Sequence, residues 1–385
     1  MKGEEKKKQE KKRNLVQWVP MIFFMLIGAG CGIIIVRFID SSSKTGRTLG
    51  QELMVLGGLI LFMYLGILIH ILIHEAGHLV FGLLSGYQFA SFRIGSFMWI
   101  KENGKLKVKR FSLAGTGGQC LMAPPDMKNG KIPVVLFNLG GSIMNLFVSL
   151  ICGLICAFIG KVTILSTILM IMVLVGIGSA VVNGVPMRLG IVDNDGYNAF
   201  SLKQNPKALY AFWIQMKVNA QIGKGVRLKD MDEEWFLVPN DEDMKNSMIA
   251  VQGVLACNRL MDAQKFDKAD LLMEHLLSIE SGIVGIHRNL MICDRIFCEL
   301  IGENREDVVE QMMTKEFKKF MKSMKTFPSI LRTEYAYELL AKNKGKKAEK
   351  IKNQFEKMAL KYPYPSEIQS ELELIECAQK RDVKF

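Results

Sequence analysis

LMVLGGLILFMYLGILIHILIHEAGHLVFGLL, residues 53–84, is an almost unbroken apolar stretch that nevertheless contains three histidines and one glutamate. A helix in the hydrocarbon core of a bilayer avoids ionisable side chains, because each is costly there unless it is paired, hydrated or functional. His70, His74 and His78 are three of the five histidines in the chain, and Glu75 lies between the last two. Their concentration here therefore indicates a functional site at membrane depth.

The run His74-Glu75-Ala76-Gly77-His78 has the spacing of a zinc hydrolase motif. Side chains four positions apart share one face of a helix, so both imidazoles can reach one zinc ion while the glutamate acts as general base. The pattern would often be a chance match in a soluble helix, but it is more specific inside an apolar one. The sequence predicts one zinc per chain, bound by His74 and His78, with Glu75 as the catalytic residue.

A third zinc ligand has to come from elsewhere, because hydrolytic zinc usually takes three protein ligands and a water. No further histidine precedes residue 275, so the candidates are Asp193 and Asp195, after the last apolar stretch. We favour Asp195, because Gly196 beside it lets the backbone turn tightly. The alternative is that these carboxylates only cap a turn or helix. His70 as a fourth ligand would fill the position that catalysis needs open.

Four apolar stretches are each long enough to cross a hydrocarbon core of ~30 Å. They are residues 19–36, 53–84, 132–159 and 162–182. The first follows a basic segment but exceeds the apolar part of a usual secretory signal, and no small-residue cleavage site follows it. We therefore expect an uncleaved anchor.

The orientation follows from the positive charges near these stretches. Residues 86–131 contain eight Lys and Arg, whereas residues 38–52 contain two. Because loops rich in Lys and Arg remain in the cytoplasm, both termini are expected there. The expected location is a bacterial cell membrane, crossed several times by the chain.

Residues 87–125 differ in character from the apolar stretches on either side. Phe92, Ile94, Leu106 and Val108 follow strand-like alternation, and Asn103-Gly104 favours a tight hairpin turn. A strand edge near the site can hold an unwound substrate strand by adding it to the sheet. The alternative is a small amphipathic sheet lying at the membrane interface.

The C-terminal half reads as amphipathic helices. Residues 201–239 contain a helix that lies on the membrane surface or against the next domain, with neither favoured. Within 240–385, residues 256–277 and 335–358 share a spacing that resembles tetratricopeptide-type helix pairs, although ordinary helical packing gives similar patterns. We expect this domain to recruit or gate substrates and to bind a protein partner; the alternative is a stabilising cap without one.

Composition supports a membrane half joined to a charged soluble half. The 385 residues are 49% hydrophobic and carry a net charge of +12. The positive charge flanks the apolar stretches, where it sets topology and attracts anionic lipid, so no nucleic-acid partner is expected. The eight cysteines form no CxxC pair, which favours reduced thiols that pack as small apolar groups.

The expected fold is an α-helical polytopic membrane protein with four spans, a small β-hairpin segment between the second and third, and an all-α, tetratricopeptide-like cytoplasmic domain. The predicted domains are a basic tail (1–18), an anchor (19–37), a membrane core (53–200), a juxtamembrane helix and linker (201–239) and a helical domain (240–385).

Three motifs together resemble the site-2 protease family of intramembrane zinc metalloproteases. They are His74-Glu75-Ala76-Gly77-His78, the GxxxN run from Gly141 to Asn145, and the NxxP run from Asn183 to Pro186 that precedes Asp195-Gly196. The resemblance covers about residues 53–200. Many members have a shorter interval before the Asp-Gly pair and a leucine before the aspartate, whereas nine positions separate Pro186 from Asp195 here and Asn194 precedes it.

The resemblance implies a role for each matched residue. His74, His78 and Asp195 bind zinc, and Glu75 takes a proton from the zinc-bound water and passes it to the leaving amine. Asn145 matches the family's asparagine that faces the metal, where an amide can hold the oxyanion or the substrate strand; its alternative role is helix packing.

Asn183 matches a second family asparagine, which can brace the turn that delivers Asp195; its alternative role is an ordinary cap at the end of a span.

These features favour an intramembrane zinc endopeptidase that cuts a transmembrane or membrane-proximal segment of a protein or peptide precursor. A transporter or ion pathway also uses buried His, Glu and Asp, but the sequence lacks the repeated halves expected of one. An inactive membrane scaffold with a partner-binding domain would not need Glu75. The expected partners of the peptidase are its membrane-embedded substrate, the lipid bilayer and a protein that binds residues 240–385.

Overall fold

The structure is a computed structural model that describes residues 21–22, 25–41, 46, 48–102, 105–111, 117–187 and 193–382. The chain divides into two compact units. The first consists of Met1–Gly95 and Ala114–Asn205, and the second of Ser96–Leu113 and Pro206–Phe385.

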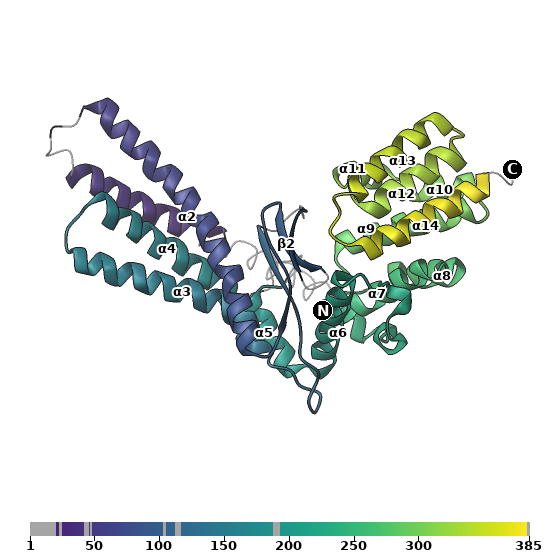
Figure 1. Ribbon diagram of the computed structural model, residues 1–385, viewed down its shortest axis with the longest axis horizontal. Coiled ribbons are helices and arrows are strands. Elements are labelled where there is room, and N and C mark those ends of the chain that lie inside the picture. The colour runs from purple at the N-terminus through teal and green to yellow at the C-terminus, as the bar shows by residue number, and fades with distance from the viewer. Residues whose placement is uncertain are drawn as a thin grey trace, which may run out of the picture. The chain divides into compact units, whose positions relative to one another are not determined.

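Three long helices form the body of the first unit. They are α2 (Leu49–Leu84), α3 (Val134–Ile159) and α4 (Ile164–Gly184), which pack side by side (Figure 1). Thr48 and Gln51 form a capping box at the start of α2, since Thr48 N donates to Gln51 Oε1 at 3.0 Å and Gln51 N donates to Thr48 Oγ1 at 3.4 Å. The apolar stretch 53–84 lies within this one continuous helix, as its composition predicts.

These three helices are the ones among the described residues that are long and apolar enough to cross a membrane. The prediction of four spans is wrong for this part of the chain. Residues 25–41 are helical, but Arg37 and Asp40 leave an apolar part shorter than the ~20 residues that a span needs. The basic tail 1–18 and part of the anchor lie outside the described residues.

Close packing of α2 on α3 depends on glycine. A Cβ on Gly77 would lie 2.8 Å from the Cα of Gly141 and would also overlap the carbonyl of Gly140. Two helix backbones can approach this closely only where side chains are absent. The glycine of the histidine motif therefore brings the motif against the start of the GxxxN run.

Four short antiparallel strands occupy the segment for which the sequence predicts a hairpin. In the first unit β1 (Gln88–Ile94) pairs with β4 (Gly118–Ala123), with an irregular register between Phe89 and Ser91. In the second unit β2 (Phe97–Glu102) pairs with β3 (Lys105–Arg110).

The pairing of β2 with β3 confirms the predicted hairpin. Glu102 lies opposite Lys105, which leaves a two-residue connection at 103–104. That turn itself is outside the described residues.

The remainder of the second unit is helical, as predicted. Its helices are α6 (Pro206–Gly223), α7 (Ser247–Asp262), α8 (Phe266–Ser278), α9 (Gly285–Ile301), α10 (Glu306–Met312), α11 (Lys315–Ser323), α12 (Pro328–Ala336), α13 (Gly345–Ala359) and α14 (Pro365–Asp382). Three short 3-10 turns lie between α6 and α7, and a π-helical stretch, Tyr337–Ala341, follows α12. The tetratricopeptide-type repeat stays a prediction.

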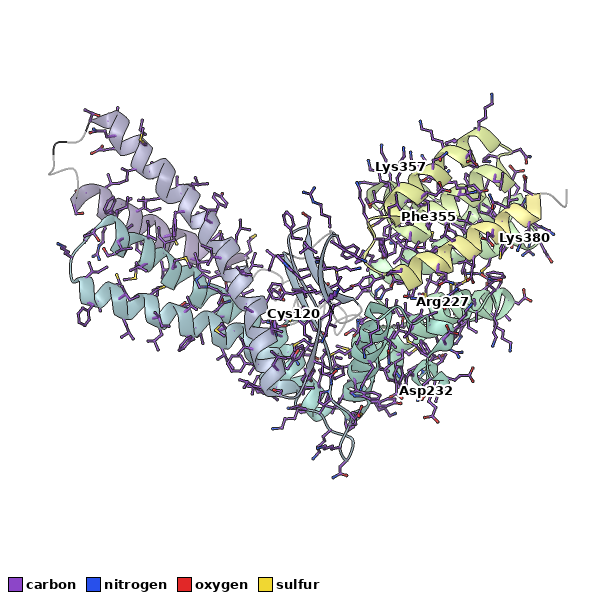
Figure 2. All side chains as sticks on the ribbon, in the orientation of Figure 1. Cys120, Arg227, Asp232, Phe355, Lys357 and Lys380 are labelled. Atoms are coloured by element: carbon purple, nitrogen blue, oxygen red, sulfur yellow. The ribbon has the colours of Figure 1, made fainter. Side chains whose placement is uncertain are left out.

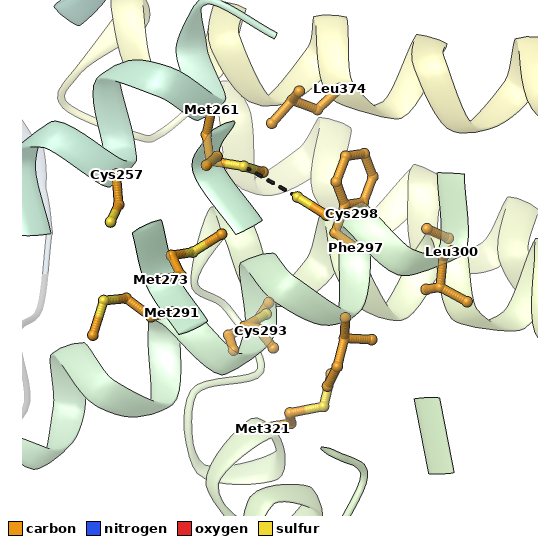
Figure 3. Packing of buried hydrophobic residues seen from close by; sticks show 14 of the residues in the cluster. Cys257, Met261, Met273, Met291, Cys293, Phe297, Cys298, Leu300, Met321 and Leu374 are labelled. Carbon is orange, nitrogen blue, oxygen red and sulfur yellow. Dashed lines mark hydrogen bonds between the residues drawn. The ribbon is translucent and has the colours of Figure 1, made fainter. Parts of the chain in front are cut away.

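The core of these helices is rich in sulfur. Figure 3 shows Cys298 on α9 directed at Met261 on α7, with Sγ and Sδ 3.5 Å apart. Phe297 and Met273 beside them are fully buried. All eight cysteines are free thiols, which agrees with their interpretation as small apolar groups.

Candidate metal centre

Side chains from two helices of the first unit meet at one point. His74 and His78 lie one turn apart on α2, and Asp195 is the first residue of α5 (Asp195–Gln204). Asp195 Oδ2 lies 3.0 Å from His74 Nε2 and 3.3 Å from His78 Nε2. The two Nε2 atoms are 3.1 Å apart. Asp195 and the two histidines, more than a hundred positions apart in the sequence, thus form one cluster of three possible metal ligands.

This donor set fits zinc. Ligand atoms at ~2.0–2.1 Å from a tetrahedral zinc lie about 3.3 Å from one another, close to the three separations above. His78 Nδ1 lies 2.9 Å from the carbonyl oxygen of Phe137 and donates to it, which leaves the lone pair of Nε2 for a metal. Both imidazoles are about nine-tenths buried.

The charge of Asp195 also suits a ligand. Burial by itself raises the pKa of this carboxyl, but the neighbouring imidazoles of His74 and His78 outweigh burial and hold the pKa well below its ordinary value. The carboxylate is therefore anionic at neutral pH, as metal binding requires.

Glu75 points toward the strands of the same unit. A Cβ on Gly118, the first residue of β4, would lie 2.6 Å from Glu75 Cγ and 2.8 Å from its Oε1. Burial and the charge of Glu75 together raise the pKa of Cys120 on β4, labelled in Figure 2, to about 12. The carboxylate of Glu75 therefore lies against β4, close enough to the three clustered residues for their charges to act on it.

The model of peptidase family M50 matches residues 62–361, which is most of the chain. The chain belongs to peptidase family M50, the site-2 protease family. Comparisons with curated proteins and with solved structures gave no match. M50 peptidases are membrane zinc metalloproteases, and the cluster of His74, His78 and Asp195 is a site of this chain that can hold the metal.

Asn194 fixes the position of Asp195 in this M50 peptidase. Its Oδ1 accepts hydrogen bonds from the backbone N–H of Met187 at 3.0 Å and of Tyr197 at 2.9 Å. Its Nδ2 donates to the carbonyl oxygens of Val182 and Val185 at 2.7 and 2.6 Å. Asn194 therefore caps α5 and ties it to the end of α4, a role that its place before Asp-Gly could have signalled.

Gly196 contributes through close packing. A Cβ at this position would overlap the carbonyl of Gly184 and lie 3.0 Å from the backbone nitrogen of Pro186. The expected tight turn is therefore less important than the contact between the first turn of α5 and the end of α4. This contact places Asp195 at the same end of the helices as the motif.

Asn145 and His70 form a buried pair beside the cluster. His70 Nδ1 lies 3.0 Å from Asn145 Oδ1, and His70 Nε2 donates to the carbonyl oxygen of Met172 at 2.9 Å. Because both its ring nitrogens are engaged, His70 is not among the three possible ligands. Asn145 is fully buried, and its Nδ2 has no partner among the described residues.

The two remaining candidates stand apart from the cluster. Asn183 Nδ2 donates to the carbonyl oxygen of Ser179, four positions earlier on its own helix, at 2.9 Å. The bracing interaction that the resemblance implies for Asn183 is made by Asn194 instead. Asp193 precedes α5 and is not one of the three clustered ligands.

Arg93 on β1 is a buried residue that sequence reasoning assigned only to the positive charge near the membrane. It is 1% exposed, and its Nη1 donates to the carbonyl oxygen of Gly95 at 2.8 Å. Its positive charge acts on Glu75. An arginine inside a half-apolar strand is the signal that could have singled it out.

We expect Gly141→Ala to weaken zinc binding about tenfold or more, the scale on which displaced supports of metal ligands act. A Cβ at this position would overlap the imidazole of His74 and push it away from the other ligands. Zinc affinity measured by competition with a chelator checks this. Gly153→Ala on the same helix is the control, since its Cβ would meet only Val173 Cγ2 at 3.8 Å. Equal affinities in the two variants would contradict the prediction.

Proposed function

We propose that this M50 peptidase is an intramembrane zinc endopeptidase that cuts a transmembrane or membrane-proximal segment of a protein or of a peptide precursor. The observation that carries the proposal is the position of the ligand cluster on α2, a helix long and apolar enough to span a membrane. His74 lies ten residues before the end of α2 at Leu84. At 1.5 Å per residue it is ~15 Å from that end, below the membrane surface.

The chemistry follows from the side chains around the cluster. A zinc ion held by His74, His78 and Asp195 would lower the pKa of a bound water and polarise the peptide carbonyl. Glu75 accepts the proton of the attacking water and returns it to the nitrogen of the leaving amine. We propose that the carboxamide of Asn145, fully buried beside the cluster, holds the oxyanion or a substrate carbonyl.

Orientation of the site is part of the proposal. The C-terminus is expected in the cytoplasm of a bacterial cell, and the zinc site opens toward the same side; an N-terminus in the cytoplasm as well would require a further span before α2. Reporter fusions after Gly46 and after Phe385 measure this: the first should report the outside and the second the cytoplasm. An externally active reporter at Phe385 would invert the orientation and place the site near the other surface.

The proposal is tested by incubating the purified protein in detergent with a model transmembrane peptide and mapping the products by mass spectrometry. We expect a cut inside the apolar segment or within a few residues of it, inhibited by a zinc chelator. Cleavage only in soluble flanking sequence would point to a peripheral peptidase. Substrate left intact under all conditions, with zinc bound, would favour a transporter or a scaffold.

The helical domain, residues 240–385, is proposed to recruit or gate substrates through a protein partner. Deleting it and comparing a natural substrate with the model peptide measures this role. Selective loss of the natural substrate supports recruitment, whereas equal loss with zinc retained would mean that part of the catalytic machinery lies there.

A further inference from the structure

The helices of the second unit line a cavity of about 310 Å³, and none of its lining residues has a role in the metal centre. This volume lies at the lower end of the range of small-ligand sites. Its walls come from α6, α7, α9, α12 and α14. The charged groups that line it are Arg227, Asp262, Asp294, Arg332, Glu367 and Glu371.

Two arginines neutralise most of these carboxylates. Arg227, labelled in Figure 2, donates from Nε to Asp262 Oδ1 at 2.9 Å and from Nη2 to Glu373 Oε2 at 3.0 Å. Arg332 Nε donates to Glu371 Oε2 at 2.9 Å, and its Nη2 donates to Asp294. These ion pairs join four helices and are structural. They leave one donor of the cavity without an acceptor and one carboxyl group without a cationic partner.

The first is a nitrogen of Arg332. This side chain is 1% exposed, with its guanidinium 4.3 Å from the centroid of the Phe297 ring. Nη1 is buried and has no acceptor among the described residues. A buried donor without an acceptor is costly, and native structures usually supply one from protein, water or ligand. A ligand oxygen in the cavity would satisfy it.

The second is the carboxyl group of Glu367, one helical turn before Glu371. It accepts a hydrogen bond from Tyr362 Oη at 2.9 Å but forms no ion pair with any described residue. Burial, with a smaller contribution from the charge of Glu371, raises its pKa to about 7. The nearest arginine, Arg332, is already engaged by Glu371 and Asp294. When Glu367 is ionised, a cation is therefore the missing partner.

We propose that this cavity binds a lysine, in a peptide or as the free amino acid, with its ammonium group on Glu367 and its carbonyl oxygen on Arg332 Nη1. Residues one turn apart on a helix lie ~5–6 Å from one another. In this arrangement the four-carbon stem of the lysine runs from Glu367 toward the guanidinium that Glu371 holds. Ile222, Val254 and Leu290 supply apolar wall for that stem.

The test is calorimetric titration of the full-length protein in detergent with Nα-acetyl-lysine amide, and with the norleucine analogue that lacks only the ammonium group. We expect the lysine probe to bind at least ~10-fold more tightly than the norleucine analogue, because the analogue cannot form the charge-assisted hydrogen bond to Glu367. Free lysine and the capped peptide Ala-Lys-Ala distinguish an amino-acid ligand from a peptide ligand.

Glu367→Gln keeps the shape of the side chain and should abolish the preference for lysine over norleucine. Glu376→Gln is the matched control, because this residue lies exposed on the same helix and outside the cavity. Ser370→Phe fills the cavity from α14 and should block both probes, with circular dichroism as the check on folding. Binding of both probes with equal affinity, binding of neither, or an unchanged lysine preference in Glu367→Gln would each overturn the proposal.

Affinity should also rise between pH 6 and pH 8, since the ionised form of Glu367 is the one that binds an ammonium group. The charged and titratable groups that face the cavity with Glu367 are Tyr362, Glu371, Arg332, Asp294, His287, Asp262 and Arg227. Burial lowers the pKa of His287, so this imidazole carries less charge over the same range than an exposed one would. A flat or falling affinity would contradict the assignment to Glu367. None of these binding readouts depends on proteolysis.

Discussion

Glu75→Gln is expected to abolish peptide hydrolysis while zinc binding and the fold are retained. Glutamine has nearly the same shape but cannot accept the proton of the attacking water. Loss of a general base lowers a rate by ~10²–10⁴-fold. Since Glu75 is not among the three clustered ligands, the metal should stay at about one ion per chain. Cleavage rates on the model transmembrane peptide, together with metal analysis of the same preparations, check this.

The control is Glu52→Gln, at the opposite end of the same helix and in its first turn. Its cleavage rate should equal that of the unchanged protein. If Glu75→Gln and Glu52→Gln cut at comparable rates, Glu75 is not the base. If Glu75→Gln instead loses zinc, this side chain supports the metal and its catalytic role is undefined.

The combined change His74→Ala and His78→Ala is expected to remove zinc almost completely, from about one ion per chain to a trace. Asp195→Ala should weaken binding strongly, because its oxygen lies 3.0 and 3.3 Å from the two imidazole nitrogens. Metal analysis of detergent-purified protein after dialysis against a weak chelator measures both effects.

Asp193→Ala is the matched control for the carboxylate, two positions away and outside the cluster. It should retain zinc. Loss of zinc in Asp193→Ala with full zinc in Asp195→Ala would transfer the third ligand to Asp193. Undiminished zinc in the double histidine variant would remove the metal site from α2 altogether.

Local patterns carried the parts of the fold that were predictable. The apolar stretch around the histidine motif is one helix because nothing in it breaks the backbone, and the i, i+4 spacing alone places His74 and His78 on one face. The alternation around Leu106 and Val108 sufficed for β3. The anchor predicted at residues 19–37 is not among the spans found in the described residues, and part of it lies outside them.

Contacts between distant residues were beyond those patterns. Asn194 can act as it does only because α4 ends beside Val182 and Val185, which leaves their carbonyl oxygens free to accept its hydrogen bonds. Arg93 looked like one more surface charge until the pairing of β1 with β4 buried it. In the helical domain, the unsatisfied nitrogen of Arg332 results from three helices meeting, and no spacing in the sequence indicates it.

The sequence by itself determined which chemistry is available: a pair of imidazoles and a carboxylate on one apolar helix, since helical periodicity is a property of adjacent residues. The tertiary structure distinguished the two candidate carboxylates, because Asp195 joins the two imidazoles in one cluster and Asp193 does not. Asp195 is 121 positions from His74 and reaches it because Gly77 lets α3 approach α2, and Gly196 lets α5 approach α4. The distance between two packed helices depends on single missing Cβ atoms at their contact. The pattern of charge and hydropathy along the chain does not indicate such contacts.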